Sequence, residues 1–246
     1  MSISINYQKR KNNTIFNKFQ TNKHLLLTNI QNYIPIYDNF FSLNDSNYNS
    51  INLNHNWFVS DINEKKHKKN NNNNNETNEI DEHIFNCKIK HSLDDNMTDN
   101  QKVFIKIAPL LDPFKYLVGK YNHTDINLFN LPSMDKSQNI HSKILNSNNS
   151  SYVDGFFSFL SSKTLHEHKF IHGIDYYGSF LCIKNQYKLN VMDDIEYLVE
   201  SEFFNKQKDV LFSIEDYSHL LLDDNKQLKP LNIDNNSEIE IDINDC

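Results

Sequence analysis

The chain has 246 residues and contains little glycine, proline or cysteine: four, five and three residues respectively. No serine, cysteine or histidine stands in a nucleophile-elbow motif with flanking glycines, so hydrolase chemistry has no support. The cysteines Cys87, Cys182 and Cys246 are widely spaced and form no C-x-x-C pair. This spacing supports neither a disulfide framework nor a zinc site, and it fits a reducing compartment.

Long apolar runs and an excess of positive charge are also missing. No run approaches the length of a membrane span and the amino terminus has no signal-peptide core, so we expect an intracellular protein without a membrane partner. The formal net charge of -7 argues against nucleic-acid binding, because phosphate contacts require clustered lysine and arginine. The one basic cluster, at 65–69, runs into an asparagine tract and is typical of a solvated loop.

The residues that are present suffice for a core if the polar tracts stay outside it. Hydrophobic residues make up 38% of the chain and aromatic residues 12%. We predict one folded unit at 24–222, with a disordered amino-terminal tail at 1–23 and an acidic disordered tail at 223–246. Inside the folded unit, the asparagine-rich segment 63–83 is expected to be a disordered insertion.

Alternating apolar and polar residues predict a three-stranded antiparallel meander, whose strands are Ile51–Ile62, Ile84–Lys90 and Lys102–Pro109. The intervening segment Asp94–Gln101 is expected to be a polar turn. A short helix after His24 should end before Pro35, and Tyr187–Val191 is a further strand candidate.

The best helix in the sequence is Ser150–His168, with Ser150 or Ser151 as its N-cap and Asp154 in its first turn. Its expected buried face consists of Tyr152, Val153, Phe156, Phe157, Leu160 and Leu165, with Ser162 and Lys163 outside. The fold class that follows is α+β: a twisted antiparallel sheet of about four or five strands with one main helix packed on it.

The third predicted strand carries the most informative residue. Val103, Ile105 and Ile107 alternate onto one face, so Lys106 projects from the other face together with Phe104 and Ala108. A lysine on a mostly apolar face needs either an anion to meet or a route to solvent. Composition alone favours a lysine that reaches solvent from a half-exposed strand.

The order of these elements resembles the small lobe of protein kinases. The V-F-I-K stretch at Val103–Lys106 is similar to the V-A-I-K strand of kinases, whose lysine holds nucleotide phosphates. Three longer stretches resemble a family of kinase-like proteins encoded by large nucleo-cytoplasmic DNA viruses. They are I-Q-N-Y-I-P-I-Y at 30–37, A-P-L-L-D-P-F-K-Y at 108–116 and F-I-H-G-I-D-Y-Y-G-S-F at 170–180. The resemblance covers residues 30–222.

This resemblance implies a nucleotide site. Lys106 would bind the phosphates of ATP, with Mg as the accompanying ion, and would pair with an acid on the following helix. Asp154 is the only acid near the start of that helix, and its alternative role is to complement the helix dipole. The resemblance also implies location in host cytoplasm or a virion, and a large lobe or another protein chain as partner.

The sequence departs from the kinase pattern in three ways. No glycine occurs before Gly119, so there is no glycine-rich phosphate loop, and Phe104 stands where kinases have a small alanine beside the adenine. The catalytic H-R-D and metal-binding D-F-G patterns are absent. We therefore expect an amino-terminal piece of a kinase-like protein that is not catalytic alone, with its last residues inside an acidic insertion.

Two hypotheses remain open. The first is the small lobe of a kinase-like phosphotransferase that another segment or chain completes. The second is a non-catalytic viral structural or interaction protein that keeps a degenerate kinase-like fold. An isolated small lobe would expose the apolar face that normally meets a large lobe and would tend to associate. A metal site at His166, His168 and His172 is disfavoured because helical residues two apart do not share a face.

Overall fold

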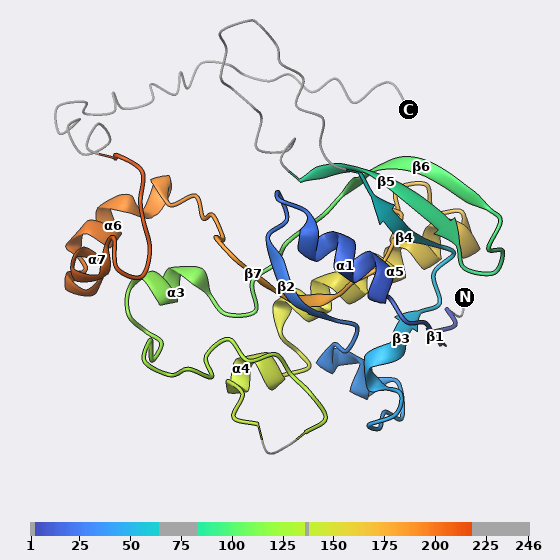
Figure 1. The fold of residues 1–246 in the computed structure, drawn as a ribbon, viewed down its shortest axis with the longest axis horizontal. Coiled ribbons are helices and arrows are strands. Elements are labelled where there is room, and N and C mark those ends of the chain that lie inside the picture. The colour runs from blue at the N-terminus through green and yellow to red at the C-terminus, as the bar shows by residue number, and fades with distance from the viewer. Residues whose placement is uncertain (1–2, 64–82, 136–137, 218–246) are drawn as a thin grey trace, which may run out of the picture. The chain divides into compact units, whose positions relative to one another are not determined.

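The computed structural model describes residues 3–63, 83–135 and 138–217 (Figure 1). It divides into two compact units, residues 1–190 and 191–246. The first unit is mixed α+β, as predicted, but the strands among its described residues form three small antiparallel sheets of two, two and three strands rather than one larger sheet. The predictions for the insertion at 63–83 and the tail at 223–246 lie almost entirely outside the described residues.

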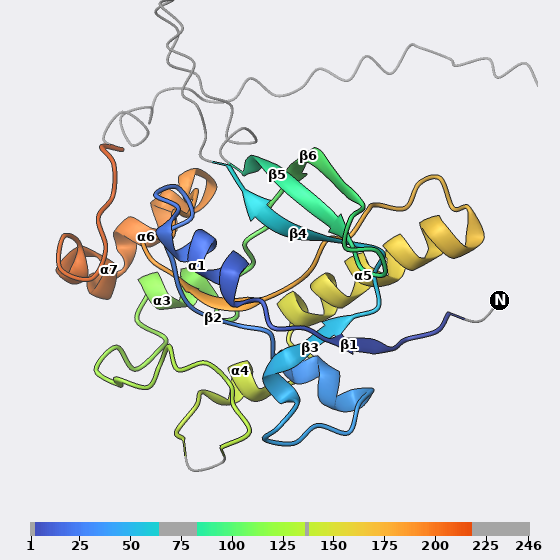
Figure 2. The same cartoon turned by 45° about the vertical axis from the view of Figure 1, so that its right-hand side comes forward.

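The predicted meander is present as β4 (Trp57–Ile62), β5 (Ile84–His91) and β6 (Thr98–Phe104), which lie side by side in Figures 1 and 2. The third strand begins and ends earlier than expected. A tight turn, in which the Met97 N–H donates to the Asp94 carbonyl, lets pairing begin at Thr98. The pairing register then ends β6 where β5 begins, so Lys106 lies beyond the strand.

The amino-terminal segment is ordered, contrary to the prediction of a disordered tail at 1–23. It forms β1 (Tyr7–Lys9) and α1 (Asn13–Thr21), and Ile15, Phe16 and Phe19 on α1 are buried. α1 packs against β4 and β2 (Leu27–Gln31). With the inward side chains of the sheet these residues form the first core cluster, which includes Leu25, Leu27, Val59, Ile62, Phe85, Cys87, Ile89 and Val103.

The segment after His24 forms a strand instead of the predicted helix. β2 pairs antiparallel with β7 (Leu181–Lys184), and its register shifts between Thr28 and Gln31. Leu26 and Asn29 have φ values of 50° and 52°, in the left-handed region that a right-handed helix cannot include. Pro35 then opens the 3-10 helix η1 (Pro35–Asn39). The strand candidate Tyr187–Val191 is likewise absent; its residues form no ladder.

Helix α5 spans Ser150–His168, the predicted bounds, but both its cap and its buried face differ. Asn149 is the N-cap, because its side chain accepts a hydrogen bond of 3.0 Å from the Ser151 N–H. The apolar residues of α5 lie on all sides of the helix, so their spacing did not identify one buried face. The buried residues are Tyr152, Phe159, Ser162 and Lys163, whereas Val153 and Phe157 are exposed.

The second core cluster lies where α5 meets η1, so α5 is not the helix that covers the three-stranded sheet. The short ribbon of β1 and β3 (Ile51–Leu53) borders this cluster, with the 3-10 helix η2 (Tyr48–Ser50) just before β3. The buried members are Ile34, Ile36, Tyr37, Ile51, Leu53, Tyr152, Phe159, Tyr176 and Leu181.

Shorter helices complete the described chain. α3 (Pro113–Leu117) and α4 (Ser142–Leu145) lie in the long connection between β6 and α5. The second unit contains η3 (Met192–Asp194), α6 (Ile195–Glu200) and α7 (Glu202–Gln207). In the described part of the chain, none of the helices combines the length and the apolar character that crossing a membrane requires.

Four polar side chains connect β1, β3, α1 and β2 in the interior. The Asn12 amide nitrogen donates to Asn32 Oδ1 at 2.5 Å and to Asn52 Oδ1 at 2.7 Å. Arg10 donates to the side-chain oxygens of Asn12 and Asn52 at 3.2 and 3.1 Å. All three asparagines are buried. We call Arg10, Asn12, Asn32 and Asn52 the amide network.

The order of the amino terminus can be tested with Phe16→Ala. Phe16 is buried and packs edge-to-face on Phe180, with ring centroids 5.0 Å apart. Deleting a buried aromatic ring leaves a cavity, so we expect the free energy of unfolding, measured by urea denaturation, to fall by about 3–5 kcal/mol. Asn17→Ala, on the exposed side of α1, should change it by less than about 0.5 kcal/mol. Equal stabilities for the two variants would contradict the packing of α1.

Candidate functional site

The two residues singled out by the sequence meet in the structure. Lys106 Nζ lies 2.8 Å from Asp154 Oδ2, an ion pair between residues 48 positions apart in the chain. Lys106 lies two residues beyond the end of β6. Asp154 is the fifth residue of α5, so it belongs to the second turn rather than to the predicted first turn. This position leaves the dipole of the helix terminus as a poor explanation for the acid.

Backbone contacts on both sides of Lys106 hold it in place. Before it, the Ile105 N–H donates to the His83 carbonyl at 2.9 Å and continues the ladder between β5 and β6. After it, the start of α5 binds the chain: Ser151 Oγ donates to the Pro109 carbonyl at 2.8 Å and the Asn149 amide to the Leu110 carbonyl at 3.0 Å. The same cap that begins α5 therefore brings Asp154 to Lys106.

The ion pair remains open to water. The side chains of Lys106 and Asp154 are 61% and 45% exposed. An exposed ion pair contributes about 0–1 kcal/mol to stability, so the fold does not depend on this contact. An ammonium group that is fixed by a carboxylate and still exposed can donate a further hydrogen bond to a phosphate oxygen.

Phe104, the last residue of β6, precedes Lys106 by two positions. Its side chain is 56% exposed and meets the ring of His83 edge-to-face, with centroids 5.9 Å apart. The resemblance to kinases placed Phe104 where they have a small alanine beside the adenine. In the structure the ring is more than half exposed, so it leaves an apolar surface at the end of β6 where a flat ring could stack.

His166, near the end of α5, contacts an acidic residue of the following segment. His166 Nε2 lies 2.5 Å from Asp175 Oδ1, which connects the helix to the segment that follows it. No group of three or more potential ligands that could hold a metal ion occurs within residues 3–63, 83–135 and 138–217.

Sequence reasoning missed a buried polar cluster beside the amide network. His55 is only 4% exposed, and neither ring nitrogen has a hydrogen-bond partner among the described residues. Its ring packs edge-to-face on Tyr176. Lys163, 8% exposed, donates to the Asn54 carbonyl at 3.3 Å and pairs with Glu167. Nothing in the local sequence distinguishes these residues from the many surface polar residues of this chain.

Burial determines the ionisation of this cluster. Desolvation lowers the pKa of His55 to about 3, and the positive charges of Arg10 and Lys163 lower it further. Desolvation also lowers the pKa of Arg10 to about 10, opposed by Tyr176. His55 is therefore neutral in the folded protein at neutral pH.

Comparison with known proteins gives no match: no family model, no curated protein and no solved structure is similar to this chain. The functional assignment therefore depends on the residues of this chain and their geometry.

The His55 cluster predicts acid sensitivity. The folded-state pKa lies below the ordinary value of 6.5, so the unfolded chain takes up a proton that the folded chain refuses, and stability present above pH 6.5 is lost as the pH falls toward 3. We expect the free energy of unfolding to fall by about 2 kcal/mol between pH 7 and pH 5. His55→Phe should remove this part of the decline in urea titrations, whereas His172→Phe at an exposed position should retain it. The same decline in both variants would contradict this assignment.

Proposed function

We propose that this chain is the small lobe of a kinase-like protein and that it contacts nucleotide phosphates through Lys106. The observation that carries the proposal is the 2.8 Å ion pair between Lys106 and Asp154. In the kinase pattern, a strand lysine and a helix acid form such a pair, and the lysine contacts the phosphates of ATP. The meander before Lys106 and the helix after it occur in the same order here.

The geometry supports contact with a phosphate more than it supports catalysis of phosphate transfer. Asp154 orients the Lys106 ammonium, and the exposed Nζ retains donor capacity for a phosphate oxygen. The sequence offers no catalytic-loop base and no D-F-G aspartate for Mg²⁺. The proposed role is therefore nucleotide binding by this lobe, with phosphate transfer requiring residues that another segment or chain supplies.

A second function is favoured by one feature of α5. Val153 and Phe157 lie one turn apart and are 45% and 69% exposed, although both are large and apolar. An exposed apolar stripe on a helix suits contact with another protein. A non-catalytic interaction protein would use this stripe and would leave Lys106 and Asp154 as a surface ion pair.

Nucleotide binding separates the two functions. In thermal denaturation of the full chain, Mg–ATP should raise the melting temperature, because a ligand at about 100 times its Kd adds about 2.7 kcal/mol of stability. We expect Lys106→Ala to abolish this rise. Its melting temperature without ATP should change by only a degree or two, because the exposed ion pair contributes little.

Lys102→Ala is the matched control, since it removes the same charge from an exposed position four residues away on β6. This variant should retain the response to ATP. An ATP response that survives Lys106→Ala would rule out the phosphate contact. No response in the unmodified chain would favour the interaction protein.

A further inference from the structure

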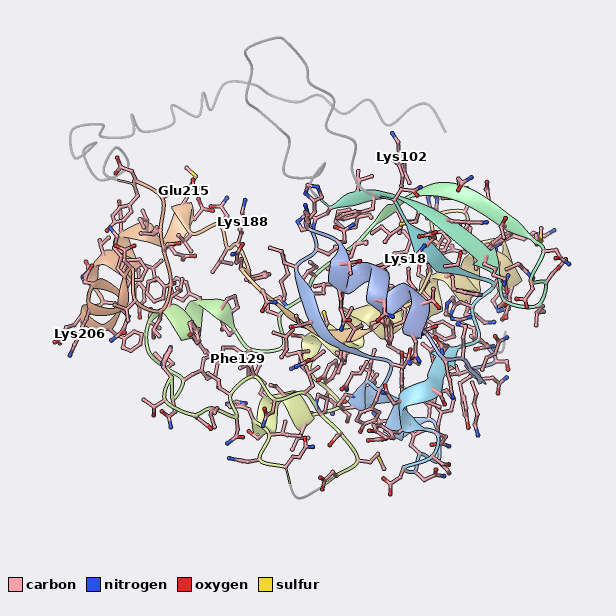
Figure 3. The ribbon with its side chains drawn as sticks, in the orientation of Figure 1. Lys18, Lys102, Phe129, Lys188, Lys206 and Glu215 are labelled. Atoms are coloured by element: carbon pink, nitrogen blue, oxygen red, sulfur yellow. The ribbon has the colours of Figure 1, made fainter. Side chains whose placement is uncertain are left out.

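Strand β6 forms an edge of the three-stranded sheet. The sheet order is β4-β5-β6, and among the described residues no second strand pairs with β6. Six of its seven residues are exposed; only Val103 is buried. The lysine Lys102 points away from the ribbon at this edge (Figure 3). An edge strand presents backbone donors and acceptors to any other strand that approaches it.

The hydrogen bonds at the two ends of β6 show which residues present these groups. The His91 N–H donates to the Met97 carbonyl, and the Ile105 N–H donates to the His83 carbonyl, both at 2.9 Å. Residues 97 and 105 thus face β5, and because backbone direction alternates along a strand, so do 99, 101 and 103. The residues that direct N–H and C=O outward are Thr98, Asn100, Lys102 and Phe104.

β6 lacks two of the features that usually protect an edge strand, a proline and a bulge. β6 contains no proline, and its pairing with β5 has no register shift, unlike the pairing of β4 with β5. One outward donor is occupied: the Asn100 N–H binds the carboxylate of Asp99 at 2.7 Å. A side chain next to the donor can be displaced by an incoming carbonyl, so the edge remains competent for pairing.

We infer that β6 pairs antiparallel with β6 of a second copy of this chain, around a two-fold axis at Gln101. When two copies of one strand pair in a continuous sheet, the residues that lie opposite each other have their side chains on the same face. Their numbers therefore differ by an even number, and the two-fold axis must pass through a residue and not between two residues. An axis at Asp99 would oppose two aspartates and an axis at Lys102 two lysines, which are destabilising arrangements. Axes at Asn100 and Gln101 keep like charges apart.

Pairing around the axis at Gln101 covers more of β6 and its apolar side chains than pairing around the axis at Asn100. It alone pairs the whole of β6, since Thr98 then lies opposite Phe104 of the second copy. It also sets the half-exposed Met97 opposite Ile105 of the second copy, an apolar pair on the inner face. With the axis at Asn100, Thr98 would instead face Lys102 and the strand ends would remain unpaired. The second copy thus covers apolar surface at both ends of the strand.

Disulfide trapping in the full chain tests this register, with Cys246→Ser in every variant. Gln101→Cys places two sulfurs opposite each other at a pair that is not hydrogen-bonded, where the Cα atoms lie about 4.5 Å apart, within disulfide range. We expect a cross-linked dimer on mild oxidation. Thr98→Cys is the matched control: its sulfur faces Phe104 of the second copy, so this variant should form no disulfide cross-link. Equal cross-linking of both variants, or of neither, would overturn the proposal.

Sedimentation of the full chain provides the second test. A single strand pair is a small interface, so we expect dimers at about 100 μM chain or above. Gln101→Lys and Gln101→Glu should each weaken association by about fivefold, and their mixture should restore it, since opposite charges then face each other. Stronger association of Gln101→Lys alone would indicate the axis at Asn100 and overturn the register. A chain that stays monomeric at every concentration, or that binds only an unrelated extended peptide, would contradict self-pairing.

Discussion

The need to pair buried amides is the constraint on which the first unit depends. Asn12, Asn32 and Asn52 are buried, and each would cost about 1–3 kcal/mol if its polar atoms lost their partners. They come from the start of α1, the residue after β2 and the middle of β3. Their hydrogen bonds to one another therefore fix three segments at one point. Arg10 closes the network, with its guanidinium 3.6 Å from the ring centre of Phe58 on β4.

The position of the candidate site depends on this network through a series of packing contacts. With its N-cap residue, Asn12, fixed by the amide network, α1 presents Ile15, Phe16 and Phe19 to the sheet and completes the first core cluster. Pairing with β5 in turn determines where β6 ends, and the chain that carries Lys106 runs on from that point toward α5. The cap of α5 grips the chain just after Lys106 and brings Asp154 to it. The helix cap, the strand register and the packing of the core thus position an ion pair that itself contributes little to stability.

The sequence predicted those parts of the fold in which one local pattern dominates. Alternation identified the meander, and the helix 150–168 was correct to the residue. Prediction from the sequence failed where tertiary contacts determine the secondary structure. Helix α1 was missed because its three buried apolar residues lie among polar ones. The segment of β2 was predicted as a helix, but two residues with left-handed backbone angles interrupt it. The pairing of Lys106 with Asp154 was a candidate only, because spacing does not show which way a helix faces. The buried cluster of His55 and Lys163 left no sequence signal, since asparagine, lysine and histidine are common throughout this chain.

The central claim is that Lys106 is a phosphate ligand held ready by Asp154. The most direct measurement is the NMR signal of the lysine side-chain ammonium groups in the full chain during titration with Mg–ATP. The account predicts that the Lys106 signal shifts and saturates, while that of Lys102, four residues earlier and within β6, stays in place. Equal small shifts of both signals, or none at Lys106, would contradict it and leave the ion pair as a surface contact.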